Sequence, residues 1–167
     1  MKTLKKILFS IVLGFVAVGA QATALSDYWE NKLIDGLFRG QTVTFPATQY
    51  LGLTTDACSD VGPGTEPVGN AYARVSVASS LANWAGTQAA ASTTASTGTG
   101  GTTSNNIVIT WPTSTGAWGT LVAVRFYDAA SAGNMIACIA LNASLNVSGS
   151  GFTPSFPAAS LTFQIDN

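Results

Sequence analysis

Few residues in this chain could carry out chemistry, and the first constraint is the residue type that it lacks. The 167 residues include no histidine. This excludes a Ser-His-Asp triad, a Cys-His pair and any metal site with a histidine ligand. The two cysteines, Cys58 and Cys138, are too few for a four-cysteine zinc site. Dispersed carboxylates are the main reactive groups that remain.

Three acidic residues, Asp56, Asp60 and Glu66, share one predicted loop. Calcium takes several oxygen ligands, so these acids could meet around one ion, but their spacing does not match an EF-hand loop. No two acids stand out as the carboxylate pair that a glycosidase needs. The sequence therefore predicts no catalytic residue, no cofactor and no metal ion, and hence a protein that is not an enzyme.

The two cysteines lie in contrasting surroundings. Cys58 belongs to the polar segment TTDACSD, whereas Cys138 belongs to the apolar segment IACIA. In an exported chain an even number of cysteines permits one bridge, and a loop of this length would gain about 4–5 kcal/mol from it. A strand side chain that faces the core does not easily reach a surface loop. A Cys58–Cys138 disulfide and two free thiols therefore both stay open.

Tryptophan and arginine supply the other candidate contacts. Trp111 and Trp118 flank the turn-like segment PTSTGA, and we expect them to cover the end of a sheet. A tryptophan that is instead exposed, at Trp84, Trp111 or Trp118, could stack on a carbohydrate. Arg74 and Arg125 fall within predicted strands and are candidates for fixed ion pairs, with simple surface solvation as the alternative.

The N-terminal residues resemble a targeting segment. Lys2, Lys5 and Lys6 precede an apolar run at 7–20, and the small residues at 20–24 are typical of a cleavage site. We expect residues 1–24 to be a signal peptide, with an uncleaved N-terminal anchor or a start codon placed too far upstream as alternatives. Residues 25–167 are expected to form a single β-rich domain.

Charge is scarce in that domain. Four cations, Lys32, Arg39, Arg74 and Arg125, stand against all eight acidic residues of the chain. Scattered cations of this number cannot form a surface that follows a phosphate backbone, so we expect no nucleic-acid partner. Contact with a membrane is expected only through the N-terminal segment, if it is uncleaved.

One helix is predicted, over residues 25–40. Apolar residues recur there at steps of three and four, Ser26 or Asp27 can cap the start, and Gly40 can end it. Such a stripe is more often a packing face than a ligand site, and it must pack on a sheet of its own chain or on a neighbouring subunit. A helix that precedes a sandwich is a ready docking element. The residues that we predict for an assembly face are Tyr28, Trp29, Leu33, Leu37 and Phe38.

After the helix the apolar period changes to two, which predicts strands. Short strands between Gly- and Pro-rich turns favour a mainly β fold: an antiparallel β-sandwich or jelly-roll-like domain with one short N-terminal α-helix. Alternation places Val122, Val124 and Phe126 on the core side. The stretch 86–106 has no apolar residue larger than alanine and is predicted to be a flexible low-complexity loop. The predicted strands are 42–45, 49–54, 72–78, 107–111, 121–127, 135–141, a start near 145–147, and 161–165.

Several sequence blocks carry a family likeness when they are taken in order. They are LSDYWENKL at 25–33 with FRG at 38–40, YLGLTTD at 50–56, GTE at 64–66, AYAR at 71–74, WGT at 118–120, FYDA at 126–129 and GN at 133–134. With these blocks, residues 24–167 resemble a family of short phage tail-fibre-like or minor virion structural proteins. The resemblance implies a β-rich, non-enzymatic particle component and carries over no catalytic or ligand residue. The signal-like segment, the length of 86–106 and the cysteines depart from the family pattern.

Three hypotheses for function follow. The leading one is a non-catalytic virion structural protein that acts by self-association and surface contact, with itself and other virion proteins as partners. The second is an exported bacterial cell-surface or filament subunit that uses the same module. The third is a carbohydrate-binding β-sandwich. The virion and the exported state are accordingly the two expected locations.

Overall fold

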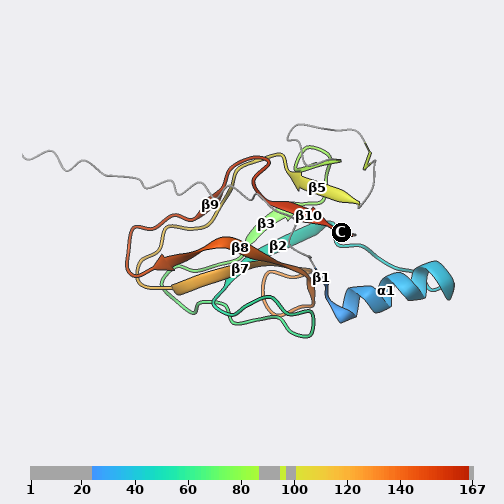
Figure 1. The fold of residues 1–167 in the computed structure, drawn as a ribbon, viewed down its shortest axis with the longest axis horizontal. Coiled ribbons are helices and arrows are strands. Elements are labelled where there is room, and N and C mark those ends of the chain that lie inside the picture. Colours follow the sequence, from blue (N-terminus) through green and yellow to red (C-terminus); the bar gives the residue numbers. More distant parts are fainter. Residues whose placement is uncertain (1–23, 87–94, 97–100, 166–167) are drawn as a thin grey trace, which may run out of the picture.

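Antiparallel strands make up most of the fold, and one helix lies near its start (Figure 1). The chain is known from a computed structural model that describes residues 24–86, 95–96 and 101–165. The predicted signal segment therefore lies, apart from residue 24, outside the described residues. Over the part of the chain that is described, no helix is long and apolar enough to cross a membrane. The elements are β1 (Ala24–Leu25), α1 (Asp27–Phe38), β2 (Thr48–Thr54), β3 (Val75–Ala78), β4 (Trp84–Ala85), β5 (Thr102–Asn105), β6 (Ile109–Thr110), β7 (Gly119–Tyr127), β8 (Met135–Val147), β9 (Ser155–Phe156) and β10 (Thr162–Gln164).

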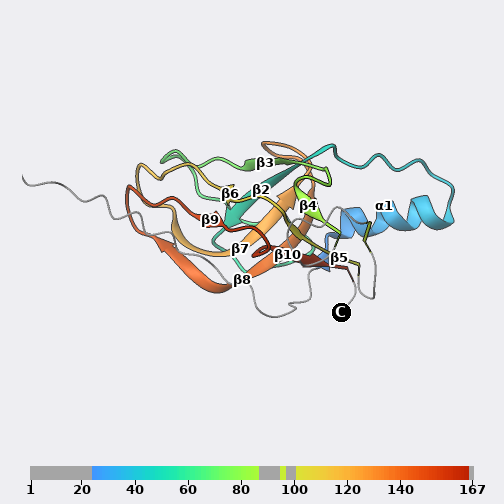
Figure 2. The same ribbon diagram turned by 90° about the horizontal axis from the view of Figure 1, so that it is seen from above.

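The strands form one large sheet and two small ones. The large sheet has the order β1-β8-β7-β2-β3, and the small sheets are β10-β5-β4 and β6-β9. The three-stranded sheet packs on one face of the large sheet, since Phe126 of β7 lies 5.8 Å from Trp84 of β4 and 6.3 Å from Phe163 of β10, between ring centroids (Figure 2). Ile109 of β6 and Phe156 of β9 join the same core cluster as Phe126. The main apolar core lies between these layers. The predicted mainly β, sandwich-like fold with one N-terminal helix is confirmed.

Strand β7 shows where simple alternation succeeds and where it fails. Val124 and Phe126 face the main core, as predicted. A β-bulge between Leu121 and Ala123 interrupts the pairing with β8, so Leu121 joins the same core cluster and Val122 is only half-buried. The predicted inward position of Val122 is therefore wrong. The opposite face of β7 is also buried, and Arg125 and Tyr127 have no solvent exposure there.

The predicted loop 86–106 contains a strand at its end. Residues 102–105 form β5, which pairs with β4 and β10, and Asn105 is fully buried. The amide of Asn105 donates to the carbonyl oxygens of Ile107 and Pro157 and accepts from the backbone N–H of Leu161. Hydrogen bonds therefore replace apolar contact in this part of the interior. The loop prediction is wrong for 102–105, and residues 87–94 and 97–100 lie outside the described residues.

The segment after the helix is not the strand that was predicted for 42–45. Residues 39–47 instead run back irregularly from the end of α1 to β2. Phe45 in this segment stacks on Trp29 of α1, with 5.8 Å between the ring centroids. Without a partner strand, the alternating pattern of 42–45 has no ladder to join.

Helix α1 begins two residues later than predicted. Ser26 is its N-cap and accepts a hydrogen bond from the backbone N–H of Trp29 at 3.4 Å. The backbone N–H of Ser26 also donates to Ile136 on β8 at 3.0 Å. The start of the helix is therefore fixed to the large sheet, whereas its far end projects away from the strands (Figures 1 and 2).

Candidate functional site

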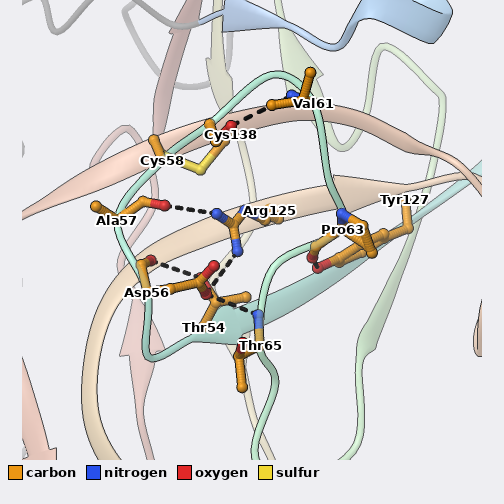
Figure 3. The surroundings of a disulfide bond; sticks show 11 residues. Thr54, Asp56, Ala57, Cys58, Val61, Pro63, Thr65, Arg125, Tyr127 and Cys138 are labelled. Carbon is orange, nitrogen blue, oxygen red and sulfur yellow. Dashed lines mark hydrogen bonds and ion pairs between the residues drawn. A yellow bond between two sulfur atoms is a disulfide. The ribbon is translucent and has the colours of Figure 1, made fainter.

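Two ion pairs of the β body involve residues of the segment that joins β2 and β3. Arg125 of β7 is fully buried there, and its Nη1 donates to Oδ1 of Asp56 at 2.8 Å while its Nη2 donates to the carbonyl of Ala57 at 2.7 Å (Figure 3). A buried guanidinium is tolerated only when it is paired and hydrogen-bonded. The prediction of a fixed ion pair at Arg125 is confirmed.

Asp56 is held in its charged form by these contacts. Burial by itself would raise its pKa, but the hydrogen bond from Arg125, the backbone N–H of Thr65 and the positive charge of Arg125 together outweigh burial. The pKa of Asp56 therefore lies below its ordinary value of 3.8. The carboxylate is an ion-pair partner for Arg125 over the whole neutral range.

A second ion pair lies beside the first. Nε and Nη2 of Arg74 donate to the same oxygen of Glu66, at 2.9 and 2.7 Å, and the hydroxyl of Tyr72 donates to the other oxygen at 2.6 Å. The Arg74 guanidinium also lies 3.3 Å above the ring centroid of Tyr127, in cation–π geometry. The ion-pair prediction for Arg74 is likewise confirmed.

These pairs overturn the idea of a shared calcium site. Asp56 and Glu66 are engaged by different arginines, and Asp60 takes part through its backbone carbonyl, which accepts from the N–H of Asp27 at 3.3 Å. Among the residues that the structure describes, no group of three histidine, cysteine, aspartate or glutamate side chains is placed to hold a metal ion.

Cys58 and Cys138 form a disulfide next to Arg125 (Figure 3). If Cys138 faced the main core, it could not easily reach the loop that carries Cys58. It faces the other side of the sheet instead, in a small cluster with Ala123, Tyr127 and Met135, and the segment that carries Cys58 crosses this side. A buried strand residue and an exposed loop residue can therefore meet, with 5.5 Å between their Cα atoms.

Two further contacts hold the same segment against the sheet. The hydroxyl of Tyr127 donates to the carbonyl of Pro63. Burial of this hydroxyl, together with the negative charge of Glu66, raises the pKa of Tyr127 to about 12. Gly64 has a φ of +73°, and a Cβ at this position would lie 1.1 Å from Nη1 of Arg125. Glycine is therefore required where the backbone passes over the guanidinium. We call this arrangement the clamp, defined as segment 55–66 with Arg125, Tyr127 and Cys138.

The clamp is suited to holding a loop. Its carboxylates Asp56 and Glu66 are neutralised by Arg125 and by the neighbouring Arg74, and its disulfide ties segment 55–66 to β8. The sequence analysis identified both arginines and both cysteines as candidates but did not predict that they lie together on one face of the sheet. The bulge in β7 and the covered second face of the sheet leave no periodic pattern in the sequence.

The tryptophans are mostly buried. Trp111 and Trp118 are 1% and 4% exposed, and Nε1 of Trp118 donates to the carbonyl of Asn70 at 2.9 Å. Stacking of either ring on a carbohydrate is therefore ruled out in this structure, and the hypothesis is wrong for these two residues. Trp84 is half-buried and lines a cavity of about 490 Å³ between the layers.

The predicted assembly face on α1 divides into two parts. Trp29 is buried against its own chain and Leu33 is half-buried, whereas Tyr28, Leu37 and Phe38 are 41%, 74% and 78% exposed. Two more exposed apolar side chains lie on the same projection, Ile34 and Phe45, and were not part of the predicted face. Ile34 shares the helical apolar pattern, but Phe45 was assigned to a strand. We call α1 with the return segment 39–47 the arm.

Comparison with known proteins places the chain in a family. A family model described as podophage GP4 fiber I protein gp80 matches residues 24–164. No curated protein matches the chain. The matched region spans the arm, the clamp and all three sheets. The chain therefore belongs to the podophage GP4 fiber I protein family and is a virion structural fibre protein.

Proposed function

We propose that this fibre protein is a self-associating subunit whose arm docks on a neighbouring copy. The observation that carries the proposal is the exposure of the arm. Leu37, Phe38 and Phe45 are 74%, 78% and 63% exposed, and Ile34 is 51% exposed, on a projection that the described β body does not cover. A group of exposed apolar side chains is typical of a protein–protein interaction site.

The magnitude of apolar burial supports docking of the arm. Full burial of one leucine, isoleucine or phenylalanine contributes about 1.5–3 kcal/mol. Charge contributes little, because the Arg39–Asp35 pair of the arm is exposed, with Arg39 71% accessible. The arm is therefore suited to an apolar contact that changes little with salt concentration.

The body of the chain supports the arm from a fixed base. The cap residue Ser26 is buried and hydrogen-bonds to β8 through its backbone N–H. The next residue, Asp27, donates its backbone N–H to Asp60 of the clamp segment, which the disulfide ties to β8. A helix that is fixed at one end and apolar at the other end favours docking as a preformed unit, which limits the entropy lost on association.

The experiment replaces Leu37 and Phe38 by lysine in the full chain. Lysine suits the C-terminal turn of a helix, so α1 should remain folded while its exposed end becomes charged. The matched control replaces Val68 and Val108 by lysine, because these residues are 92% and 61% exposed and lie outside the arm and the clamp. Each variant is supplied to assembling particles, and its amount per purified particle is measured.

We expect the arm variant to be depleted from particles at least tenfold and the control to be incorporated normally. Near-ultraviolet circular dichroism should show the same folded body for both variants. Incorporation of the arm variant at the normal level would exclude the arm as the docking element.

A second candidate function is an exported cell-surface or filament subunit that uses the same module. The Cys58–Cys138 disulfide favours it, because such bridges persist in oxidising compartments, and residues 1–24 have the pattern of a signal peptide. N-terminal sequencing of the native protein tests it. A start near Thr23 or Leu25 would support export, whereas an intact Met1 in a particle would contradict it.

A further inference from the structure

An apolar cavity opens between the two layers of the β body. It has a volume of about 490 Å³ and is lined by aromatic rings from both layers: Phe126 of the large sheet, and Trp84 and Phe163 of the three-stranded sheet. Leu81, which is 58% exposed, also lines it. Among the described residues that line this cavity, none is charged. The cavity is therefore suited to an uncharged, apolar occupant.

The cavity opens at the end of the molecule that carries the arm. Gln49 of β2 lines it and lies two residues past the end of the return segment of the arm. Ile136 also lines it, and its carbonyl accepts the N–H of Ser26 at the base of α1. In both ribbon views α1 projects from the same end as β5 and β10, and Figure 2 shows β4 at that end as well (Figures 1 and 2).

Each chain thus carries two apolar features at one end, the exposed arm and the cavity, that no other described residues cover or fill. The arm does not fill the cavity of its own chain, because its end projects outward and Leu37 and Phe38 are exposed. A second copy that meets this end supplies an arm of matching chemistry. Reciprocal contacts of this kind close into a symmetric oligomer instead of an open chain.

We propose that the apolar end of the arm of one copy, Leu37 and Phe38, inserts into the Trp84–Phe126–Phe163 cavity of a second copy. The inference rests on the proposed self-association and adds to it the surface that receives the arm. The cavity then becomes a receptor for a segment of the same protein, and the smallest assembly is a closed oligomer joined at the arm end.

The test is a cysteine crosslink between two singly substituted proteins. Arg39→Cys places a thiol beside the arm end and leaves Leu37 and Phe38 in place, and Ser80→Cys places one among the residues that line the cavity. Both proteins keep the Cys58–Cys138 disulfide, are mixed and are exposed to a mild oxidant. The control mixture pairs Ser80→Cys with Val68→Cys, whose position is 92% exposed in the β2–β3 connection.

We expect a crosslinked species of two chains in the Arg39→Cys and Ser80→Cys mixture, at least tenfold above the control mixture. Peptide mapping should locate the bond between positions 39 and 80. If the proteins self-associate without this crosslink, the cavity is not the receptor although the proposed function survives. If neither protein self-associates, both proposals fail. A doubly substituted chain that crosslinks only within itself would show that the arm folds back, which also overturns the inference.

A charge at the mouth of the cavity gives an independent measurement. Leu81→Lys should raise the dissociation constant of self-association at least tenfold, whereas Val68→Lys should leave it unchanged. If Leu81→Lys abolished binding to a glycan panel and left self-association intact, the cavity would belong to a carbohydrate and the inference would be wrong.

Discussion

Removal of the disulfide should destabilise the protein by a predictable amount. Cys58 and Cys138 are separated by 80 residues in sequence. In the chain-entropy model, a crosslink that closes a loop of this size contributes about 4.5 kcal/mol to the free energy of unfolding at 25 °C. We predict a loss of this size for the double substitution Cys58→Ser and Cys138→Ala. Alanine suits position 138, which is 1% exposed in an apolar cluster.

The native structure should change little in this variant. Arg125 still contacts Asp56 and Ala57, and Tyr127 still donates to Pro63, so segment 55–66 keeps its place on the sheet. The effect therefore falls on the unfolded chain, which gains the freedom that the crosslink removed. A domain with an ordinary free energy of unfolding, about 5–15 kcal/mol, would remain folded after this loss, but its free energy of unfolding would be much smaller.

Urea unfolding followed by tryptophan fluorescence measures the loss. With a slope of about 2 kcal/mol per molar urea, the midpoint should fall by about 2 M. Wild-type protein unfolded in the presence of a reductant is the control, and it should match the variant to within about 1 kcal/mol. A loss below about 1 kcal/mol in both would refute the reasoning, because it would mean that the bridge does not constrain the unfolded chain.

Three other predictions concern the clamp. Gly64→Ala should cost at least about 2 kcal/mol in urea unfolding, since alanine is strained at this φ and its Cβ displaces the Arg125 guanidinium. The pKa of Asp56 is lowered on folding, so the stability that its carboxylate contributes is complete above its ordinary pKa of 3.8 and is lost as the pH falls below that value. Asp56→Asn should therefore flatten the pH dependence of the free energy of unfolding in that range. The pKa of Tyr127 is raised to about 12, so the stability that its neutral hydroxyl contributes is complete below pH 10 and is lost as the pH rises toward 12. A titration followed by tyrosine absorbance should lack the ionisation near pH 12 in Tyr127→Phe.

The sequence predicted the fold class and the principal strands because these depend on local pattern. The apolar alternation at Val124 and Phe126 and the helical spacing around Trp29 both lead to buried positions. Pattern failed where an irregular feature decided the outcome. One bulge moves Leu121 into the core in place of Val122, and hydrogen bonds place Asn105 in an interior that composition alone would exclude.

The candidate sites were harder to predict than the strands. The position of Cys138 on a covered second face, and not in the main core, depends on where the β2–β3 connection crosses the sheet. The assembly face was predicted as one apolar stripe, but burial of Trp29 by Phe45 depends on the path of the return segment. Long-range packing of this kind leaves no signal at the spacing of a single helix or strand.

The measurement that tests self-association through the arm most directly is the mass of the protein in solution. Light scattering over a dilution series should give at least twice the chain mass for the wild type and for the Val68→Lys, Val108→Lys control. The Leu37→Lys, Phe38→Lys variant should have the mass of one chain at the same concentrations. A wild-type protein that is a single chain throughout, or an arm variant that keeps the wild-type mass, would contradict the account.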